Sequence, residues 1–75
     1  MTDVDRSWTG ITQEQFIRAV EALPAESRAV FRLRAFGRAY DQIASELQIS
    51  RDAVATRLRL ARALLRDALV GAVHA

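Results

Sequence analysis

The first stretch in which apolar residues recur at helical spacing runs from residue 12 to residue 23. Four side chains repeat at the intervals of one helix face: Phe16, Ile17, Val20 and Leu23. Thr12 and Gln15 have the spacing of a capping box, in which each side chain bonds to the other's backbone N–H. Pro24 disfavours helical geometry in the residue before it. The pattern therefore predicts a helix over about residues 12–22.

Two shorter apolar patterns follow before residue 50. Pro24 suits the first turn of a helix, since its missing N–H has no intrahelical partner there, and Gly37 is a good residue just past a helix end. The apolar stripe of this second helix consists of Val30, Phe31, Leu33 and Phe36. A third helix over about residues 40–47 is marked by Tyr40, Ile43, Ala44 and Leu47.

The last pattern predicts one long helix. Ser50 is a strong N-cap candidate, and no glycine or proline interrupts the chain from Arg51 until Gly71. Its core-facing positions are Val54, Leu58, Ala61, Leu65 and either Ala68 or Leu69. No alternating strand pattern is present in the sequence. The predicted fold class is all-α, with four helices and a long C-terminal helix.

The segment before the first helix has a different character. Residues 1–11 are mostly polar and include Gly10, so we expect a flexible N-terminal lead and one domain over residues 12–75. Trp8 is the exception, because an isolated tryptophan near a terminus usually folds back onto the core. Met1 and the acidic character of this segment favour a free-standing protein.

Composition excludes several classes of protein. The 75 residues allow one small domain, and the absence of cysteine excludes a disulfide framework. A lone histidine, His74, cannot by itself build a metal site or a catalytic triad. No nucleophile–base pair or glycine-rich phosphate loop is present, so we expect neither an enzyme nor a cofactor. Without a membrane span or signal peptide, the expected location is the cytoplasm, with no membrane partner.

Charge separates along the chain. The net charge is only +2, and all 11 basic residues are arginines. Residues 1–26 hold five acids against two arginines, whereas residues 27–75 hold nine arginines against four acids. A basic C-terminal part on a small domain indicates an anionic partner, most often nucleic acid.

The third and fourth predicted helices form a candidate helix-turn-helix over about residues 40–66. In that motif the first helix crosses the DNA backbone, and the N-terminal part of the second enters the major groove. On a helical wheel, Arg51, Arg62 and Arg66 lie on one flank and Arg57 on the other, while Thr56 and Arg59 point away from the core. This arrangement suits phosphate contacts on both sides of a groove.

The segment from Ala22 to Leu69 resembles region 4 of sigma-70-type RNA polymerase sigma factors, especially the extracytoplasmic-function group. The residues that match the family pattern are Leu23-Pro24, Val30-Phe31, Leu33-Arg34, Gly37, Tyr40, Ile43-Ala44, Leu47, Ile49-Ser50, Val54, Arg57-Leu58, Ala61-Arg62 and Leu65-Arg66. The resemblance implies recognition of a −35 promoter element in double-stranded DNA and contact with the flap of the polymerase β subunit. The chain has no room for region 2, so we expect either an excised C-terminal domain of a sigma factor or a free-standing protein of region-4 type, and not a complete sigma factor.

The resemblance and the wheel together give the candidate DNA contacts: Arg38, Tyr40, Ser50, Arg51, Thr56, Arg57, Arg59 and Arg62. The Tyr40 hydroxyl could reach a phosphate, or its ring could simply pack in the core. Arg59 could read a guanine through O6 and N7. Several positions depart from the family pattern. Gln48 replaces the usual turn glycine, Gln42 replaces the usual acid before Ile43, and Ala53 and Ala55 replace polar residues early in the recognition helix.

Two alternatives stay open. The domain could be a protein-interaction module that binds the β flap or an anti-sigma factor and binds DNA poorly, which the alanines at 53 and 55 favour. It could also be a NarL/LuxR-type regulator that dimerises through its last helix. Leu60, Leu64 and Val73 lie partly off the core stripe and could form a weak homodimer seam.

Overall fold

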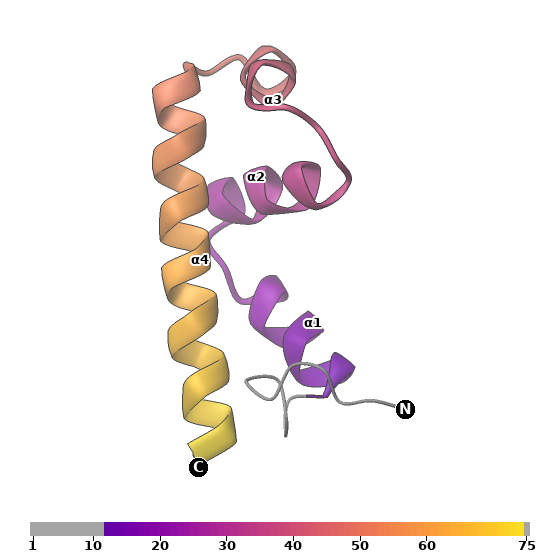
Figure 1. The fold of residues 1–75 in the computed structure, drawn as a ribbon, viewed down its shortest axis with the longest axis vertical. Coiled ribbons are helices and arrows are strands. Elements are labelled where there is room, and N and C mark those ends of the chain that lie inside the picture. The colour runs from indigo at the N-terminus through magenta and orange to yellow at the C-terminus, as the bar shows by residue number, and fades with distance from the viewer. Residues whose placement is uncertain (1–11, 75) are drawn as a thin grey trace.

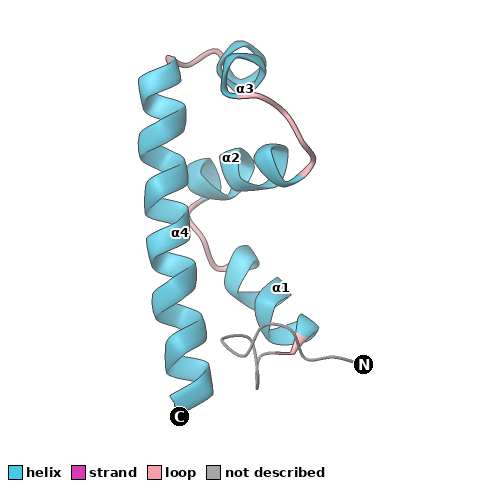
Figure 2. Cartoon of the chain, viewed as in Figure 1, coloured by secondary structure: helices cyan, strands magenta, loops and turns pink. Residues whose placement is uncertain are grey.

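Four helices make up the described part of the chain in the computed structural model, which covers the backbone of residues 12–74 and the side chains of residues 12–71. They are α1 (Gln13–Glu21), α2 (Ala25–Ala35), α3 (Tyr40–Leu47) and α4 (Arg51–His74). No residue in this part of the chain lies in a strand (Figure 2). The all-α prediction and the order and extent of the four predicted helices are confirmed.

The helix starts follow the predicted caps. The Thr12 hydroxyl accepts a hydrogen bond from the Gln15 backbone N–H at 3.0 Å, and the Gln15 side chain accepts one from the Thr12 N–H at 2.9 Å. Pro24 occupies the N-cap of α2. At α4, the Ser50 hydroxyl accepts a hydrogen bond from the Ala53 N–H at 3.0 Å. These local bonds satisfy N–H groups that have no partner within the helix.

Two helices end in left-handed backbone. After α2, Gly37 has φ 94°, and the Arg38 N–H donates to the Leu33 carbonyl at 3.1 Å, as in a Schellman motif. After α3, Gln48 takes φ 57°, and the Ile49 N–H donates to the Ala44 carbonyl at 2.9 Å. Gln48 therefore occupies the conformation for which the family normally supplies glycine.

The long helix α4 is the spine against which the other three helices pack (Figure 1). Near its N-terminal end lies the α3 cluster of buried residues: Val30, Ile43, Ala44, Val54 and Leu58. Further along lies the α1 cluster: Val20, Leu23, Ala61 and Leu65. The predicted core stripe of α4 is confirmed, with Leu69 rather than Ala68 buried at its C-terminal end.

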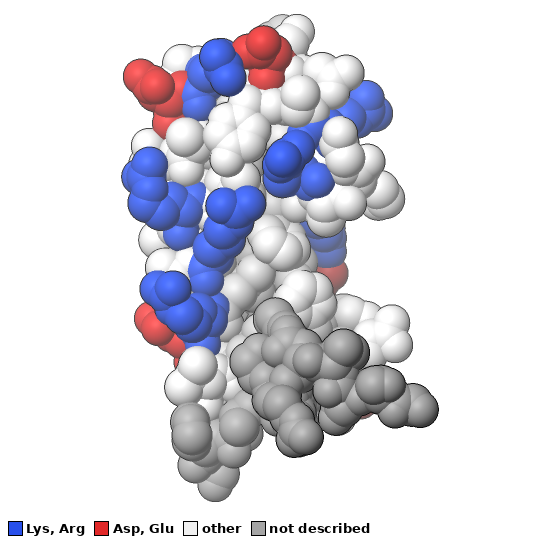
Figure 3. All heavy atoms as spheres, in the orientation of Figure 1, with Lys and Arg blue, Asp and Glu red and all other residues white. Residues whose placement is uncertain are grey.

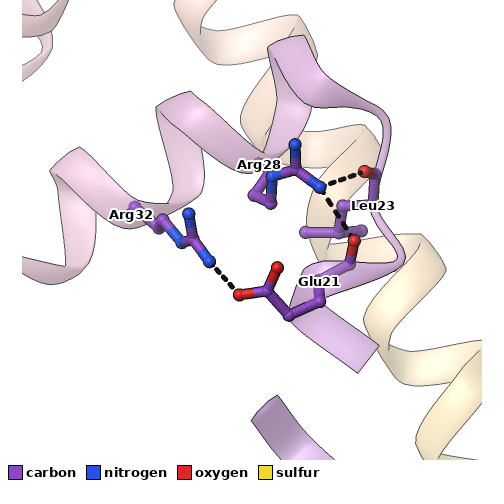
Figure 4. A network of polar contacts seen from close by, with 4 residues as sticks. All are labelled: Glu21, Leu23, Arg28 and Arg32. Carbon is purple, nitrogen blue, oxygen red and sulfur yellow. Dashed lines mark hydrogen bonds and ion pairs between the residues drawn. The ribbon is translucent and has the colours of Figure 1, made fainter. Parts of the chain in front are cut away.

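An arginine clasp fixes α2 against the end of α1 (Figure 4). Arg28 donates from Nη1 to the backbone carbonyl of Glu21 at 2.8 Å and more weakly to that of Leu23 at 3.4 Å. Arg32 forms an ion pair with the Glu21 carboxylate. The guanidinium of Arg28 thus satisfies carbonyls at the C-terminal end of α1, where positive charge is favourable.

Two predicted core residues lie at the surface instead. Phe36 is 82% exposed, because it is the C-cap residue of α2 and lies where the chain turns away toward α3. Ile17 is 50% exposed, since it follows Phe16 by one position and points off the face that packs on α4. The predictions for the lead of residues 1–11, for Trp8 and for the side chain of Val73 lie outside the described residues. Among the described helices, none is long and apolar enough to cross a membrane.

Candidate nucleic-acid interface

Arginines of α4 gather along one flank of the helix. Arg51, Arg59, Arg62 and Arg66 are all exposed, and at about 100° per residue they fall within about 80° of one another on the helical wheel. Figure 3 shows basic side chains running along α4 on this face, with acidic ones bordering the row at its two ends. We refer to these four residues as the arginine row. It can neutralise several phosphates along one strand.

The turn between α3 and α4 brings polar groups to the start of the arginine row. Because the Ser50 hydroxyl uses its oxygen to accept from Ala53, its O–H remains able to donate to a phosphate. Arg51 Nε lies 2.8 Å from Asp41 Oδ1 on α3, and the two side chains are 67% and 75% exposed. Such an exposed pair contributes little to stability, so Arg51 can exchange its partner for a phosphate at small cost.

Arg57 lies on the opposite flank of α4 from the arginine row, as the wheel predicts. Its side chain is only 29% exposed, and its Nη2 lies 3.7 Å from Glu26 Oε1 in the first turn of α2. That distance is an ion-pair distance, longer than a hydrogen bond. Arg57 is therefore the most enclosed of the candidate DNA contacts on α4.

Tyr40 packs its ring against the core, one of the two roles left open for it, and the phosphate contact of its hydroxyl stays a prediction. Its ring is half-buried against the α3 cluster, and the guanidinium of Arg34 stands 5.5 Å from the ring centroid. The same Arg34 donates from Nη1 to the Arg38 carbonyl at 2.9 Å, which holds the connector between α2 and α3. The Arg38 side chain is exposed beside this connector. The cation–π contact between Arg34 and Tyr40 thus ties α3 to α2.

The remaining candidates occupy the outer side of α4. Thr56, Arg59 and Arg62 are exposed, whereas Ala53 and Ala55 are half-buried. Ala55 falls within the wheel sector of the arginine row, so the alanine interrupts a line of positive charge. The candidates therefore fall into four groups: Arg51, Arg59 and Arg62 on the row, Arg38, Tyr40 and Ser50 around α3, Thr56 on the outer side of α4, and the isolated Arg57.

Sequence reasoning missed Arg34 and left Arg66 out of the candidate contacts. Arg66 lies in the same wheel sector as Arg59 and Arg62, and this spacing is visible in the sequence. The role of Arg34 depends on how α2 meets α3, for which the sequence carries no local signal. The ion pairs that hold Arg51 and Arg57 are likewise tertiary contacts between different helices.

A second surface is apolar. A hollow of about 270 Å³ lies between α1 and α2, lined by Phe16, Ile17, Val20, Glu21, Phe31, Arg32, Ala35 and Phe36. The rings of Phe16 and Phe31 lie 6.3 Å apart and form its floor together with Val20, whereas Ile17 and Phe36 are exposed at its rim. We call it the α1–α2 groove. Exposed apolar rims of this kind often mark protein-binding sites.

Metal-binding geometry is not found in the described part of the chain, where no group of three or more histidine, aspartate or glutamate side chains could hold an ion. None of the buried side-chain polar atoms there is without a hydrogen-bond partner. The basic side of α4 and the α1–α2 groove are two features of the described surface that suit recognition of a partner.

Comparison with known proteins gives one match. The family model described as sigma-70, region 4 matches residues 13–65, more than two thirds of the chain. No curated protein and no solved structure matches the chain. The match spans α1 to α3 and the N-terminal part of α4, which includes all eight candidate DNA contacts.

Proposed function

Because this chain belongs to the sigma-70 region 4 family, a family of DNA-binding promoter-recognition modules, we propose that α4 enters the major groove of a −35-type promoter element. In this arrangement α3 crosses the sugar-phosphate backbone, as the first helix of a helix-turn-helix does. The observation that carries the proposal is the arginine row, which begins beside the Ser50-capped N-terminus of α4. That end of the helix is also its positive dipole end.

The contacts divide by position. Arg38, Tyr40, Ser50, Arg51 and Arg62 bind phosphates around the helix-turn-helix, and Arg57 binds a phosphate on the opposite flank of α4. Thr56 and Arg59 lie on the outer side of the part of α4 that enters the groove, so they face base edges. Arg59 is the main candidate for sequence readout, because an exposed arginine can bond to guanine O6 and N7 together.

The test is selection of bound duplexes from a random pool, carried out with the unaltered chain and with Arg59→Ala. Loss of preference at one base position in the variant places Arg59 in the groove, and an unchanged motif removes that assignment. Arg18→Ala is a matched control, because Arg18 is exposed on α1, away from α3 and α4, and pairs with its neighbour Glu14. It should leave the selected motif unchanged.

Salt dependence tests the phosphate contacts separately. If about five arginines contact phosphates, log K should fall with log salt at a slope of about −4 to −5. A flat response to salt, or no duplex binding at low salt, would overturn the DNA-binding proposal.

The α1–α2 groove favours a second role, contact with RNA polymerase through the flap of the β subunit. An apolar groove with an exposed phenylalanine at its rim is suited to the apolar face of a partner helix. The groove involves neither α3 nor α4, so both partners can bind together. An anti-sigma factor is the competing occupant. Co-purification with the isolated β flap supports the polymerase, and binding of the flap that survives Phe36→Ser would argue against the groove.

A further inference from the structure

One face of α4 carries a heptad pattern that is distinct from both the core stripe and the arginine row. At alternating intervals of four and three residues it presents Ala53, Arg57, Leu60, Leu64, Asp67 and Gly71. On the wheel this set is centred about 120° from the core stripe and about 160° from the arginine row. We call it the α4 seam.

The α4 seam is open to a partner. Leu60 is 46% exposed and Leu64 is 37% exposed, although both belong to the helix that forms the spine of the core. Asp67 and Gly71 are exposed, and a Cβ atom added at Gly71 would meet no atom within 4 Å. Among the described residues, Arg57 pairs with Glu26 alone, at 3.7 Å, which leaves its guanidinium hydrogen-bonding capacity for another carboxylate.

The order of residues along the seam is self-complementary when two copies run antiparallel. With a two-fold axis level with residue 62, Leu60 of one copy lies opposite Leu64 of the other. In the same register Arg57 lies opposite Asp67, and Ala53 lies opposite Gly71. Antiparallel coiled coils pair their heptad positions in this crossed way, so every layer of the seam meets a suitable partner.

We propose that a second copy of this chain packs antiparallel against the α4 seam and forms a weak homodimer. Two apolar layers of leucine form its centre, and an Arg57–Asp67 pair closes each side. Charge selects this orientation, because a parallel pair would place Arg57 against Arg57 and Asp67 against Asp67. The close Ala53–Gly71 layers let the two backbones approach at both ends.

The contact is small. Two leucines per chain form its apolar part, which places it among transient interfaces below about 1,200 Å². Because the seam is centred about 160° from the arginine row, only Arg57 belongs both to the seam and to the candidate DNA contacts. A consequence that rests on the proposed function is that duplex DNA bound to Arg57 should compete with the Arg57–Asp67 pair.

The test is sedimentation of the intact chain at protein concentrations from about 10 µM to about 1 mM, without DNA. Asp67→Arg should weaken self-association by about tenfold or more, because both charged layers become repulsive. The double change Arg57→Asp with Asp67→Arg should restore it. In a parallel pair the double change would remain repulsive, so failure to restore overturns the antiparallel register.

Leu60→Ser with Val70→Ser as its control tests the apolar layers. The two side chains are almost equally exposed, at 46% and 48%, but Val70 lies off the seam. Leu60→Ser should weaken self-association and Val70→Ser should leave it unchanged. Helix content and thermal unfolding confirm that each variant folds. A monomer at every concentration, or equal effects of the two serine variants, overturns the proposal. None of these results depends on whether the chain binds DNA.

Discussion

The two ends of the α4 spine differ in how completely the core is closed. In the α3 cluster the larger side chains, Val30, Ile43, Val54 and Leu58, are at most 1% exposed, although Ala44 is 9% exposed. In the α1 cluster Ala61 is 0% exposed, but the larger side chains, Val20, Leu23 and Leu65, keep 5–8% of their surface exposed, and the α1–α2 groove opens beside them. The closed end carries the helix-turn-helix and its charges, whereas the open end carries an apolar hollow.

This difference suits the two roles that we propose for the two ends. A helix that enters a DNA groove must hold its side chains in a fixed register, which the tightly packed large side chains of the α3 cluster and two short turns provide. A groove for a partner helix needs apolar surface that stays uncovered until the partner arrives. One 24-residue helix, about 36 Å long, supports both arrangements along its length.

The largest loss of stability should come from shortening a buried side chain at the closed end. Ile43→Ala should lower the free energy of unfolding toward the upper part of a range of about 2–5 kcal/mol, because the side chain is fully buried between helices. For a 75-residue domain with a total stability of about 4–11 kcal/mol, that loss can unfold most molecules. Urea unfolding followed by circular dichroism measures it.

Leu23→Ala is the matched change at the open end. The loss in free energy of unfolding should fall in the lower part of the same range of about 2–5 kcal/mol. Leu23 is 5% exposed and lies in the short segment between α1 and α2, which can relax around the smaller side chain. A loss at Leu23 equal to or greater than that at Ile43 would contradict the comparison between the two ends.

The next effect concerns the open end alone. Phe36→Ser should change the free energy of unfolding by less than about 0.5 kcal/mol, since the ring is 82% exposed. The same change should weaken binding of the polymerase flap by about tenfold or more, because the proposed partner helix would bury this exposed aromatic ring. Calorimetric titration with the isolated flap measures it. Leu60→Ser, an exposed apolar change away from the groove, should bind the flap normally.

Local signals made the frame of this fold predictable. Three of these signals act within a few residues and can be read from the sequence: the Thr12–Gln15 capping box, the Ser50 cap and the helix stop at Gly37. The same spacing argument failed at Phe36, because helical periodicity does not say where α2 leaves the surface of α4. The site shows the same division. The arginine row follows from spacing, whereas the partners of Arg51 and Arg57 come from helices brought close by tertiary packing.

A smaller effect is expected when one positive charge is added to the arginine row of α4. Ala55 lies in the sector of the arginine row, so Ala55→Arg should add one phosphate contact and steepen the salt slope of DNA binding by about 0.9. Ala68→Arg adds the same charge at an exposed position outside the row and should change the slope little. Fluorescence anisotropy over a salt series measures both. Equal slopes for the two variants would mean that the row does not face DNA.

The smallest effect is at the turn between α3 and α4. Gln48 holds φ 57° and ψ 49°, a conformation that costs a residue with a Cβ about 1–2 kcal/mol. Glycine adopts it freely but loses more backbone entropy on folding, so Gln48→Gly should stabilise the domain by a net amount of about 0.5–1 kcal/mol. A rise in the thermal midpoint measures it.

Gly37→Ala is the converse change at the equivalent turn after α2. Gly37 has φ 94°, and an added Cβ would meet no atom within 4 Å, so any loss comes from backbone strain alone. It should destabilise the domain by about 1 kcal/mol.

If Gln48→Gly instead lowered stability, the Gln48 side chain would have to make a contact that stabilises the fold by more than its backbone strain costs. The closed end of the molecule would then depend on Gln48 itself, and the departure from the family's glycine would be a stabilising one.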